Sequence, residues 1–382
     1  MKLRLGLICH RGVGGSARVA VELSGELARR GHEVHLFARS SPLGLEAPQA
    51  GVSLHTLALT GGEHPVSAEL DVKWSAAELD TLAARVAAVG PLDVVHAHYA
   101  VPFAWVAERV GRRLGPRSPA LVATLHGTDV SELARRPQRQ RALRASLSRL
   151  DAVTTVSHSH AALAQRRLGL APRVIPNFVD TDRFPPARHG DGRRPRIAHV
   201  SNFRPVKQPE SMARIYARVR RELDAELWIV GDGEAMPRAA AMLRRAAVAG
   251  DVKLLGLRVD PERVLPCTDL LVVTSRTESF CLAALEAAAC GIPVVAPRVG
   301  GIPELVADGH TGRLFEPGDE DGAVRAIVGL LSDPALRARM GRAARERARR
   351  FSSASVVPLY ERLYRDVTGS RRADVSQAAG AG

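Results

Sequence analysis

One segment sets the architecture of this chain: Leu270-Leu-Val-Val-Thr-Ser-Arg-Thr-Glu-Ser-Phe-Cys-Leu-Ala-Ala-Leu-Glu-Ala-Ala-Ala-Cys-Gly291. Its apolar start predicts a buried parallel strand, and Leu282–Cys290 predicts a helix that a glycine and a proline end. Glu278 lies at the carboxyl end of the strand, where open α/β sheets bind ligands, and Glu286 lies one to two turns into the helix. Two such acceptors can hold two hydroxyl-bearing parts of one ligand; a capping glutamate and a solvated helix glutamate explain the pair equally well.

Apolar runs alternate with helical patterns along the rest of the chain, which predicts βαβ units and parallel sheets. The predicted strands are residues 3–9, 33–37, 94–97, 121–125, 152–156, 173–175, 197–200, 225–230, 252–255, 270–274 and 293–296. The fold class is therefore α/β, with two doubly wound domains. We expect them to face each other across a cleft, with ligands at the carboxyl ends of the strands.

The domain boundary is predicted from composition. Residues 184–195 are polar and rich in proline and glycine, which is typical of a linker. They separate an N-terminal domain, 1–183, from a C-terminal domain, 196–354. The small, polar residues 371–382 predict a disordered tail.

Charge and composition exclude several classes of protein. The net charge is +14, but nearly all of the positive charge is arginine on predicted helix faces, without interleaved aromatics, so we expect no nucleic-acid partner. No apolar stretch is long enough to span a bilayer, and no signal peptide precedes the first strand. The four cysteines fit neither a disulfide framework nor a zinc spacing, which suits a reducing cytoplasm.

A glycine-rich loop, Gly12-Val-Gly-Gly-Ser16, follows the first strand and precedes a helix. Glycines let the backbone approach a ligand, and the helix start offers free N–H groups to an anion. The sequence is neither a Rossmann fingerprint nor a P-loop, and a plain turn remains an alternative. Two later turns, Gly231-Asp-Gly233 and Gly300-Gly301, could place backbone amides near a nucleotide or be ordinary βα turns.

Histidines cluster at two predicted strand ends. His96 and His98 lie on one face of a strand, and His126 begins a His-Gly-Thr-Asp turn after the next strand. Such histidines are most often packed or capping residues. No carboxylate accompanies the pair, so we expect no metal site and no required cofactor.

Lys207 stands out because the chain has only four lysines. It ends the segment Asn202-Phe-Arg-Pro-Val-Lys207, which follows the first strand of the second domain. A cation here, Lys207 or Arg204, could neutralise a diphosphate leaving group, although a solvated turn is the alternative.

The Glu278–Glu286 block, with Ala-Cys-Gly-Ile-Pro-Val-Val and Val-Gly-Gly-Ile-Pro-Glu304 after it, resembles retaining GT-B glycosyltransferases of family GT4 over nearly the whole chain. Further blocks resemble the GT4 subfamily that glycosylates L-malate in bacillithiol biosynthesis. They are Val13–Ser16, His96–Pro102, Leu125–Asp129, Val174–Asp180 and His199–Lys207. The resemblance implies two Rossmann-like domains and a final helix, at about residues 355–368, that packs back on the first domain.

The resemblance also implies roles for individual residues. It makes Glu278 the contact to sugar hydroxyls and Glu286 the contact to the nucleotide ribose. Catalysis would fall to His126, Lys207, Arg204 and Glu278. Donor binding would involve Gly14, Gly15, Asn202, Arg204, Lys207, Glu278, Ser279, Phe280 and Glu286. Two positions depart from the pattern: Ala17 replaces a loop glycine, and Asn202 replaces an arginine that many members carry.

The implied reaction transfers N-acetylglucosamine from UDP-GlcNAc to L-malate with retention and without a metal. Malate is a small dianion, and its candidate contacts are Ser16, Tyr99, Thr128, Asn202 and Arg204, with Lys73 as a further possibility. Two alternatives stay open: another acceptor, such as inositol phosphate, a lipid-linked sugar or a glycan, and a non-catalytic sugar-nucleotide-binding protein. A homo-oligomer is possible.

Overall fold

The computed structural model describes residues 2–10, 15–38, 50–56, 75–132, 135–187 and 193–380, the last with backbone alone at residues 372 and 374–380. Gly14, Lys73 and part of the expected linker lie outside the described residues. The chain divides into two compact units: Met1–Pro176 with Val356–Gly382, and Asn177–Ser355. The division falls at residues 176/177, ahead of the stretch 184–195 that composition indicated.

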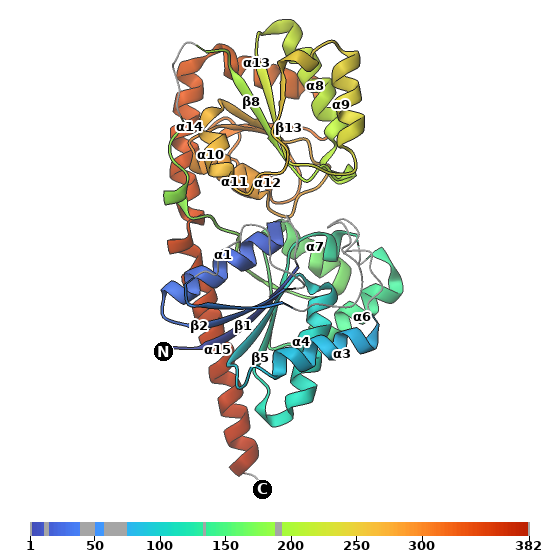
Figure 1. Cartoon of the computed structure of the whole chain (residues 1–382), viewed down its shortest axis with the longest axis vertical. Coiled ribbons are helices and arrows are strands. Elements are labelled where there is room, and N and C mark those ends of the chain that lie inside the picture. The colour runs from blue at the N-terminus through green and yellow to red at the C-terminus, as the bar shows by residue number, and fades with distance from the viewer. Residues whose placement is uncertain are drawn as a thin grey trace. The chain divides into compact units, whose positions relative to one another are not determined.

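Unit 1 is built on a parallel sheet of seven strands in the order β3-β2-β1-β4-β5-β6-β7. The strands are β1 (Arg4–Cys9), β2 (Glu33–Ala38), β3 (Val52–Thr56), β4 (Val94–His98), β5 (Ala120–Leu125), β6 (Ala152–Thr155) and β7 (Arg173–Val174). The order reverses between β1 and β4, which is the point where doubly wound sheets bind ligands. Figure 1 shows this sheet with its helices on both faces.

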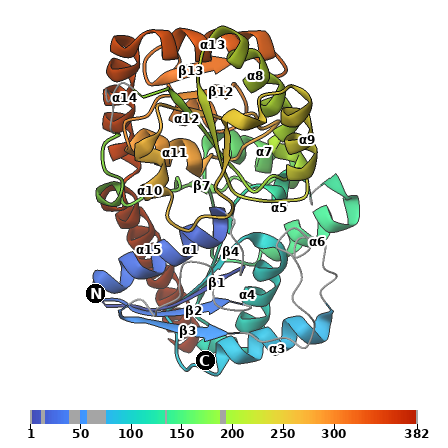
Figure 2. The same ribbon diagram turned by 45° about the horizontal axis from the view of Figure 1, so that its top comes forward.

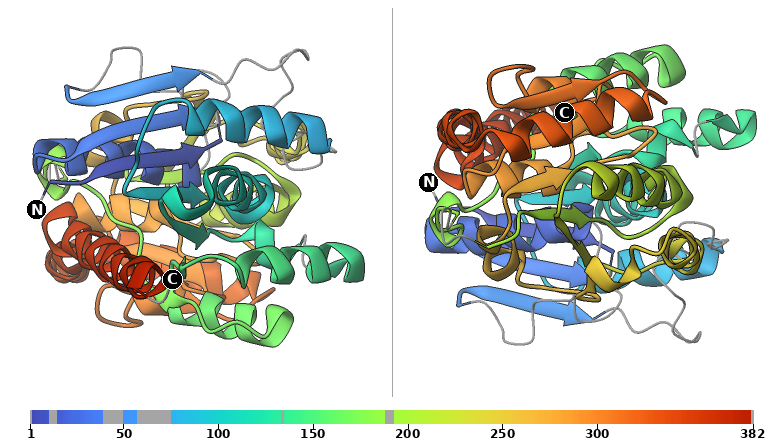
Figure 3. Two further views of the ribbon diagram at one scale, coloured as in Figure 1. Left: turned by 90° about the horizontal axis from the view of Figure 1, so that it is seen from below. Right: turned by 90° about the horizontal axis from the view of Figure 1, so that it is seen from above.

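The helices of unit 1 are α1 (Gly15–Arg29), α3 (Ala76–Ala87), α4 (Ala100–Leu114), α5 (Thr128–Ser131), α6 (Pro137–Leu147) and α7 (His158–Leu168). One apolar core packs α3, α4, α6 and α7 against a single face of the sheet. The apolar residues of these helices recur at helical spacing, so each helix buries one stripe. Helix α1 lies on the opposite face of the sheet (Figure 3).

Unit 2 repeats the design with a parallel sheet of six strands in the order β10-β9-β8-β11-β12-β13. The strands are β8 (Arg196–Val200), β9 (Glu226–Val230), β10 (Val252–Leu254), β11 (Leu270–Val272), β12 (Val294–Pro297) and β13 (Gly312–Phe315). Its helices are α8 (Pro209–Glu222), α9 (Met236–Arg245), α10 (Pro261–Val264), α11 (Leu282–Ala289), α12 (Ile302–Leu305), α13 (Glu320–Ser332) and α14 (Pro334–Ala348). Helices α8, α9 and α13 pack on its core (Figure 2).

The last helix, α15 (Ser353–Gly380), starts in unit 2 and from Val356 onward groups with unit 1. There it joins the face that carries α1: the Glu361 carboxylate lies 3.1 Å from Nε2 of His32, which follows α1. The helical backbone continues to Gly380, so the prediction of a disordered tail from residue 371 differs from the structure. The two parallel sheets confirm the predicted α/β class.

Candidate active site

The predicted donor residues of unit 2 follow two neighbouring strands. β8 and β11 pair in the sheet, so the loop that carries Lys207 and the loop that carries Glu278 leave the same edge side by side. Lys207 closes a short 3₁₀ turn, Pro205–Lys207, and Glu278 lies between β11 and α11. The sheet therefore brings these two sequence-distant residues together.

Lys207 and Glu278 form an ion pair. The Lys207 ammonium donates to Oε1 of Glu278 at 2.6 Å, and the Ser275 hydroxyl donates to the same oxygen at 2.7 Å. Burial disfavours the charged ammonium, but Glu278 outweighs it and the pKa of Lys207 is raised, so Lys207 is a cation at neutral pH. Ser275 was not a predicted site residue, because its sequence position alone does not place its hydroxyl on Glu278.

Backbone contacts hold the two loops together. The Thr274 hydroxyl donates to the Lys207 carbonyl at 2.8 Å, and the Arg276 N–H donates to the Val206 carbonyl at 2.8 Å. Gly300 has a φ of +53°, and a Cβ on it would lie 1.7 Å from the Glu278 carbonyl oxygen. Only glycine permits this approach, so the turn after β12 fixes the position of the Glu278 backbone.

The Gly231-Asp-Gly233 turn has a similar role toward the other loop. A Cβ on Gly231 would lie 1.8 Å from the Ser201 carbonyl oxygen, and one on Gly233 would lie 2.1 Å from that of Asn202. The turn thus packs against the backbone of the segment that leads to Lys207. The Asn202 side chain brings a buried Oδ1 that accepts no hydrogen bond within the described part of the chain.

Glu286 lies inside α11 and is 3% exposed, so the alternative of a solvated helix glutamate is wrong. Phe280 is buried against Phe351 with ring centroids 5.7 Å apart, which gives it a packing role in unit 2. Ser279 and Arg204 are partly exposed on the two loops. Cys281 begins α11 beside this group, and burial, with Glu278 nearby, raises its thiol pKa to about 12, so the thiol stays protonated.

In unit 1, the predicted histidines gather at the carboxyl ends of β4 and β5. Nδ1 of His98 lies 3.2 Å from Nε2 of His126. Burial, together with the neighbouring histidines, holds the pKa of His98 and His126 well below the ordinary value. Both rings are therefore neutral at pH 7, and one donates its N–H to the other.

His96 belongs to a separate buried network. Its Nδ1 lies 2.7 Å from the Tyr364 hydroxyl on α15, and its Nε2 lies 2.7 Å from the Thr124 hydroxyl. Both ring nitrogens thus have protein partners. Among the described residues, no group of three or more His, Cys, Asp or Glu side chains is arranged to hold a metal ion.

The His-Gly-Thr-Asp turn is organised by its aspartate. The fully buried Asp129 carboxylate accepts from the backbone N–H groups of Ala100, His126, Gly127 and Val130 at 2.8–3.2 Å. Helix α5 itself has no side-chain cap, so the carboxylate orders the turn ahead of it. It fixes the end of β5 to the start of α4.

Two predicted acceptor contacts meet in unit 1. The Tyr99 and Thr128 hydroxyls are hydrogen-bonded, and Tyr99 holds an unusual φ of +82° that points to a constrained position. Ser16 and Gly15 begin α1, Gly15 exposed and Ser16 partly so. The other two acceptor candidates, Asn202 and Arg204, belong to unit 2.

Two doubly wound parallel-sheet units of this kind are the GT-B fold of glycosyltransferases. Residues 13–183 match the family model described as Glycosyltransferase Family 4, and residues 194–333 match the model of glycosyl transferases group 1. The chain is 34% identical to N-acetyl-alpha-D-glucosaminyl L-malate synthase of Bacillus anthracis, over 96% of this chain and 98% of that protein. The chain therefore belongs to glycosyltransferase family 4.

Other relatives carry different names. The chain is 30% identical to D-inositol 3-phosphate glycosyltransferase of Acidothermus cellulolyticus, over 95% of this chain and 88% of that protein. In structure it is similar to sucrose-phosphate synthase of Thermosynechococcus elongatus, with a TM-score of 0.82 at 23% identity over 97% of this chain and 100% of that one. No helix in the described part of the chain is both long and apolar enough to cross a bilayer.

Proposed function

We propose that this enzyme transfers N-acetylglucosamine from UDP-N-acetylglucosamine to L-malate, the first step of bacillithiol biosynthesis. The observation that carries the proposal is the 34% identity to N-acetyl-alpha-D-glucosaminyl L-malate synthase of Bacillus anthracis over 96% of the chain. It is supported by the unit 1 blocks at His96–Pro102 and Leu125–Asp129, which contain two of the five candidate acceptor contacts, Tyr99 and Thr128. Such an enzyme would work in the cytoplasm, where its substrates would be made.

In this proposal, the donor binds to unit 2. Lys207 and Arg204 face the diphosphate, Glu278 accepts from sugar hydroxyls, and Glu286 accepts from the ribose. An ammonium has three N–H donors, and the ion pair with Glu278 uses one of them, so Lys207 keeps donors for a phosphate oxygen. Asn202 contributes a buried oxygen without a hydrogen-bond donor, which a hydroxyl or N–H of the donor could satisfy.

Catalysis would rest on stabilising the charge that develops on the leaving diphosphate. Lys207 and Arg204 would supply this positive field in place of a metal ion, and the backbone amides of Gly14 and Gly15 would add to it. The acceptor hydroxyl attacks from the side of the leaving group, and a phosphate oxygen takes its proton. This front-side route retains the anomeric configuration and needs no carboxylate nucleophile.

The acceptor contacts are assigned to Ser16, Tyr99, Thr128, Asn202 and Arg204. Tyr99 and Thr128 are already hydrogen-bonded to each other, and malate would exchange that bond for bonds to its carboxylates. His126 is neutral, which suits a group beside a carbon that becomes positive, because an imidazolium would oppose that charge.

The test is UDP release by the purified enzyme from UDP-N-acetylglucosamine with L-malate, with inositol 3-phosphate and without acceptor. We expect release to depend on L-malate, to survive a chelator, and to give an α-glycoside from the α-linked donor when the product is examined by NMR. A malate-independent rate overturns the acceptor, a chelator-sensitive rate overturns the metal-free scheme, and a β-product overturns retention.

The second candidate is transfer to inositol 3-phosphate, favoured by relatives such as the Acidothermus cellulolyticus enzyme, 30% identical over 95% of this chain. The same assay decides between the two acceptors. Binding of the sugar nucleotide without release under any condition would instead indicate the non-catalytic alternative.

A further inference from the structure

The surface made by α6 and α7 carries positive charge that the proposed reaction does not use. Between residues 133 and 179 the sequence has nine arginines and a single carboxylate side chain, Asp151. Asp151 is already engaged, because its Oδ2 accepts from the Leu121 N–H at 2.6 Å and pairs with Arg371 at 2.6 Å. This segment therefore cannot neutralise its own arginines.

Most of these arginines have no partner elsewhere in the described structure either. Arg149 pairs with Glu108 at 2.6 Å, and Arg173 pairs with Asp366 at 3.3 Å. The other seven form no ion pair with any described carboxylate: Arg135, Arg136, Arg139, Arg141, Arg144, Arg166 and Arg167. Like charges gathered without counter-charges weaken the folded state. We therefore expect this surface to have a function.

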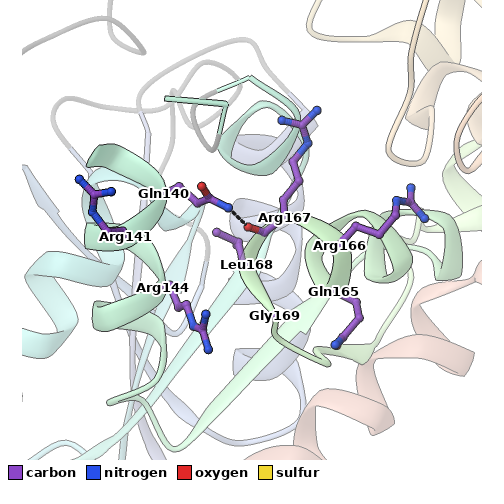
Figure 4. Close-up of a pocket in the computed structure, with 8 residues that line it drawn as sticks. All are labelled: Gln140, Arg141, Arg144, Gln165, Arg166, Arg167, Leu168 and Gly169. Carbon is purple, nitrogen blue, oxygen red and sulfur yellow. Dashed lines mark hydrogen bonds between the residues drawn. The ribbon is translucent and has the colours of Figure 1, made fainter. Parts of the chain in front are cut away.

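Four of the seven line one hollow, which we call the α6–α7 arginine pocket. Its volume is about 350 Å³. Its lining is Gln140, Arg141 and Arg144 from α6, with Gln165, Arg166, Arg167, Leu168 and Gly169 from the end of α7 (Figure 4). The lining thus contains four arginines and two glutamines, and it includes no carboxylate and no aromatic ring.

The frame of the pocket is fixed although its arginines are long. The Gln140 side-chain amide donates to the Arg167 carbonyl, which ties α6 to the end of α7. Gly169 ends α7 with a φ of +65°, and a Cβ there would lie 3.5 Å from the Arg144 guanidinium carbon. In Figure 4 the guanidinium groups point apart, as mutual repulsion dictates, and an anion between them would reverse that preference.

We propose that the α6–α7 arginine pocket binds a ligand that carries two or more phosphate groups. A guanidinium pairs with phosphate through two parallel N–H···O bonds, and four of them carry a charge of +4, which exceeds the charge of about −2 on one phosphate. The volume lies at the lower end of the range for small-molecule sites, about 300–1,000 Å³. The lining has no aromatic ring on which a base could stack, so recognition rests on the phosphates.

The probe is sodium tripolyphosphate, titrated into the full-length protein by calorimetry at low and at moderate salt. The pocket variant is Arg144→Gln with Arg167→Gln. The matched control is Arg339→Gln with Arg342→Gln, two exposed arginines of α14 that lack a described ion pair, so the net charge changes equally. We expect the pocket variant to bind about tenfold more weakly or worse, because it loses charge-assisted hydrogen bonds, and the control to bind as the wild type does.

Lys207→Ala separates this pocket from the proposed donor site. Binding that persists in Lys207→Ala and is lost in the pocket variant supports the pocket, whether or not the proposed reaction is correct. The proposal is overturned if the wild type does not bind tripolyphosphate, or if both arginine variants lose binding equally. It is also overturned if calorimetry shows a single binding event that only Lys207→Ala removes. The side chains involved are on the surface, so circular dichroism and the thermal midpoint should match those of the wild type.

A second arm identifies the source of the phosphates. Flotation with phosphatidylcholine vesicles, with and without phosphatidylglycerol, is compared for the wild type and the pocket variant. Vesicle binding that requires phosphatidylglycerol, is displaced by tripolyphosphate and is lost in the pocket variant identifies lipid headgroups. Tripolyphosphate binding without vesicle binding identifies a soluble ligand. Failure of the wild type to bind tripolyphosphate overturns the proposal, with or without vesicle binding.

Discussion

At the residue scale, the most informative pair is Lys207 with Glu278, because each side chain already pairs its charge with that of the other within the protein. Their 2.6 Å ion pair and the Ser275 hydroxyl hold the Glu278 carboxylate in one orientation. An ammonium and a carboxylate so arranged can meet a diphosphate and a sugar hydroxyl without first ordering themselves. Preorganisation of this kind is the main electrostatic contribution to catalysis in many enzymes.

Lys207→Ala should therefore lower the rate of UDP release by about 10²–10³-fold, as does removal of one preorganised donor in other enzymes. The control is Lys253→Ala, whose ammonium lies over the Trp228 ring, 4.6 Å from its centroid, on the edge strand β10. It should keep a normal rate. A near-normal rate in Lys207→Ala would remove this lysine from the diphosphate site.

Glu286→Gln tests the ribose assignment while keeping the size of a side chain that is 3% exposed. A neutral amide accepts a hydroxyl hydrogen bond less strongly than a carboxylate, so UDP should bind about tenfold more weakly by calorimetry. Glu346→Gln, at an exposed ion pair with Arg349 on α14, is the matched control and should leave the affinity unchanged. Unchanged UDP affinity in Glu286→Gln would contradict the assignment.

At the scale of the elements, the turn after β12 supports the site through backbone contact alone. Gly300→Ala should both destabilise unit 2 and lower activity, because its Cβ would overlap the Glu278 carbonyl oxygen. Gly318→Ala is a matched control: its φ is also positive, +88°, but no atom lies within 4 Å of the added methyl group. That variant should lose only about 1 kcal/mol, the usual cost of left-handed backbone in alanine, and keep its activity.

Thermal unfolding and UDP release are measured on both alanine variants to test whether the close contact of Gly300 with Glu278 supports the site. A larger loss of both quantities in Gly300→Ala than in Gly318→Ala is the expected result. Equal losses would mean that the conformation of the glycine, and not its contact with Glu278, is what matters at position 300.

Sequence patterns predicted most strands here because parallel strands buried on both faces are continuous apolar runs. They missed β3 and β13, which are the outer strands of their sheets and are only partly buried. They also did not decide whether the glycine turns serve a ligand or are ordinary βα turns. The reason is distance along the chain: the Gly231–Ser201 approach exists only once the strands have paired, and no local pattern encodes it.

In the candidate site, too, contacts between residues that are distant in sequence could not be predicted from local patterns. Glu278, Lys207 and the histidines could be found from local motifs, but their partners could not. Tyr364 reaches His96 from 268 residues away, and Ser275 becomes informative only when its hydroxyl is seen on the Glu278 carboxylate. Sequence therefore supplied the candidate site residues, whereas the structure showed the groups that contact and orient them.

At the scale of the whole molecule, each unit contains a buried neutral histidine. In unit 1, burial and then the neighbouring His126 lower the pKa of His96 to about 3. In unit 2, burial lowers the pKa of His199 to about 4, although its hydrogen bond to the Val272 carbonyl acts in the opposite direction. In the unfolded chain both side chains titrate near about 6.5. The unfolded state therefore binds more protons than the folded state below that pH.

This difference predicts that the free energy of unfolding is level above about pH 6.5 and falls as the pH drops from there toward about 4, where His199 itself becomes protonated. Each such histidine contributes a slope of at most about 1.4 kcal/mol per pH unit. The measurement is urea unfolding followed by circular dichroism across this window. The carboxylates with lowered pKa, such as Asp308, add their loss only below about pH 5, where the unfolded chain begins to bind protons at these groups while the folded forms stay charged.

His199→Gln should flatten the slope in the transition of unit 2, because glutamine has no proton to gain and can still donate to the Val272 carbonyl. His310→Gln, at an exposed position after α12, should reproduce the wild-type slope. The two transitions can separate in urea, since each unit has its own core, and the change should then appear only in the transition of unit 2. A His199→Gln protein that loses stability with falling pH as steeply as the wild type would show that other groups take up the protons.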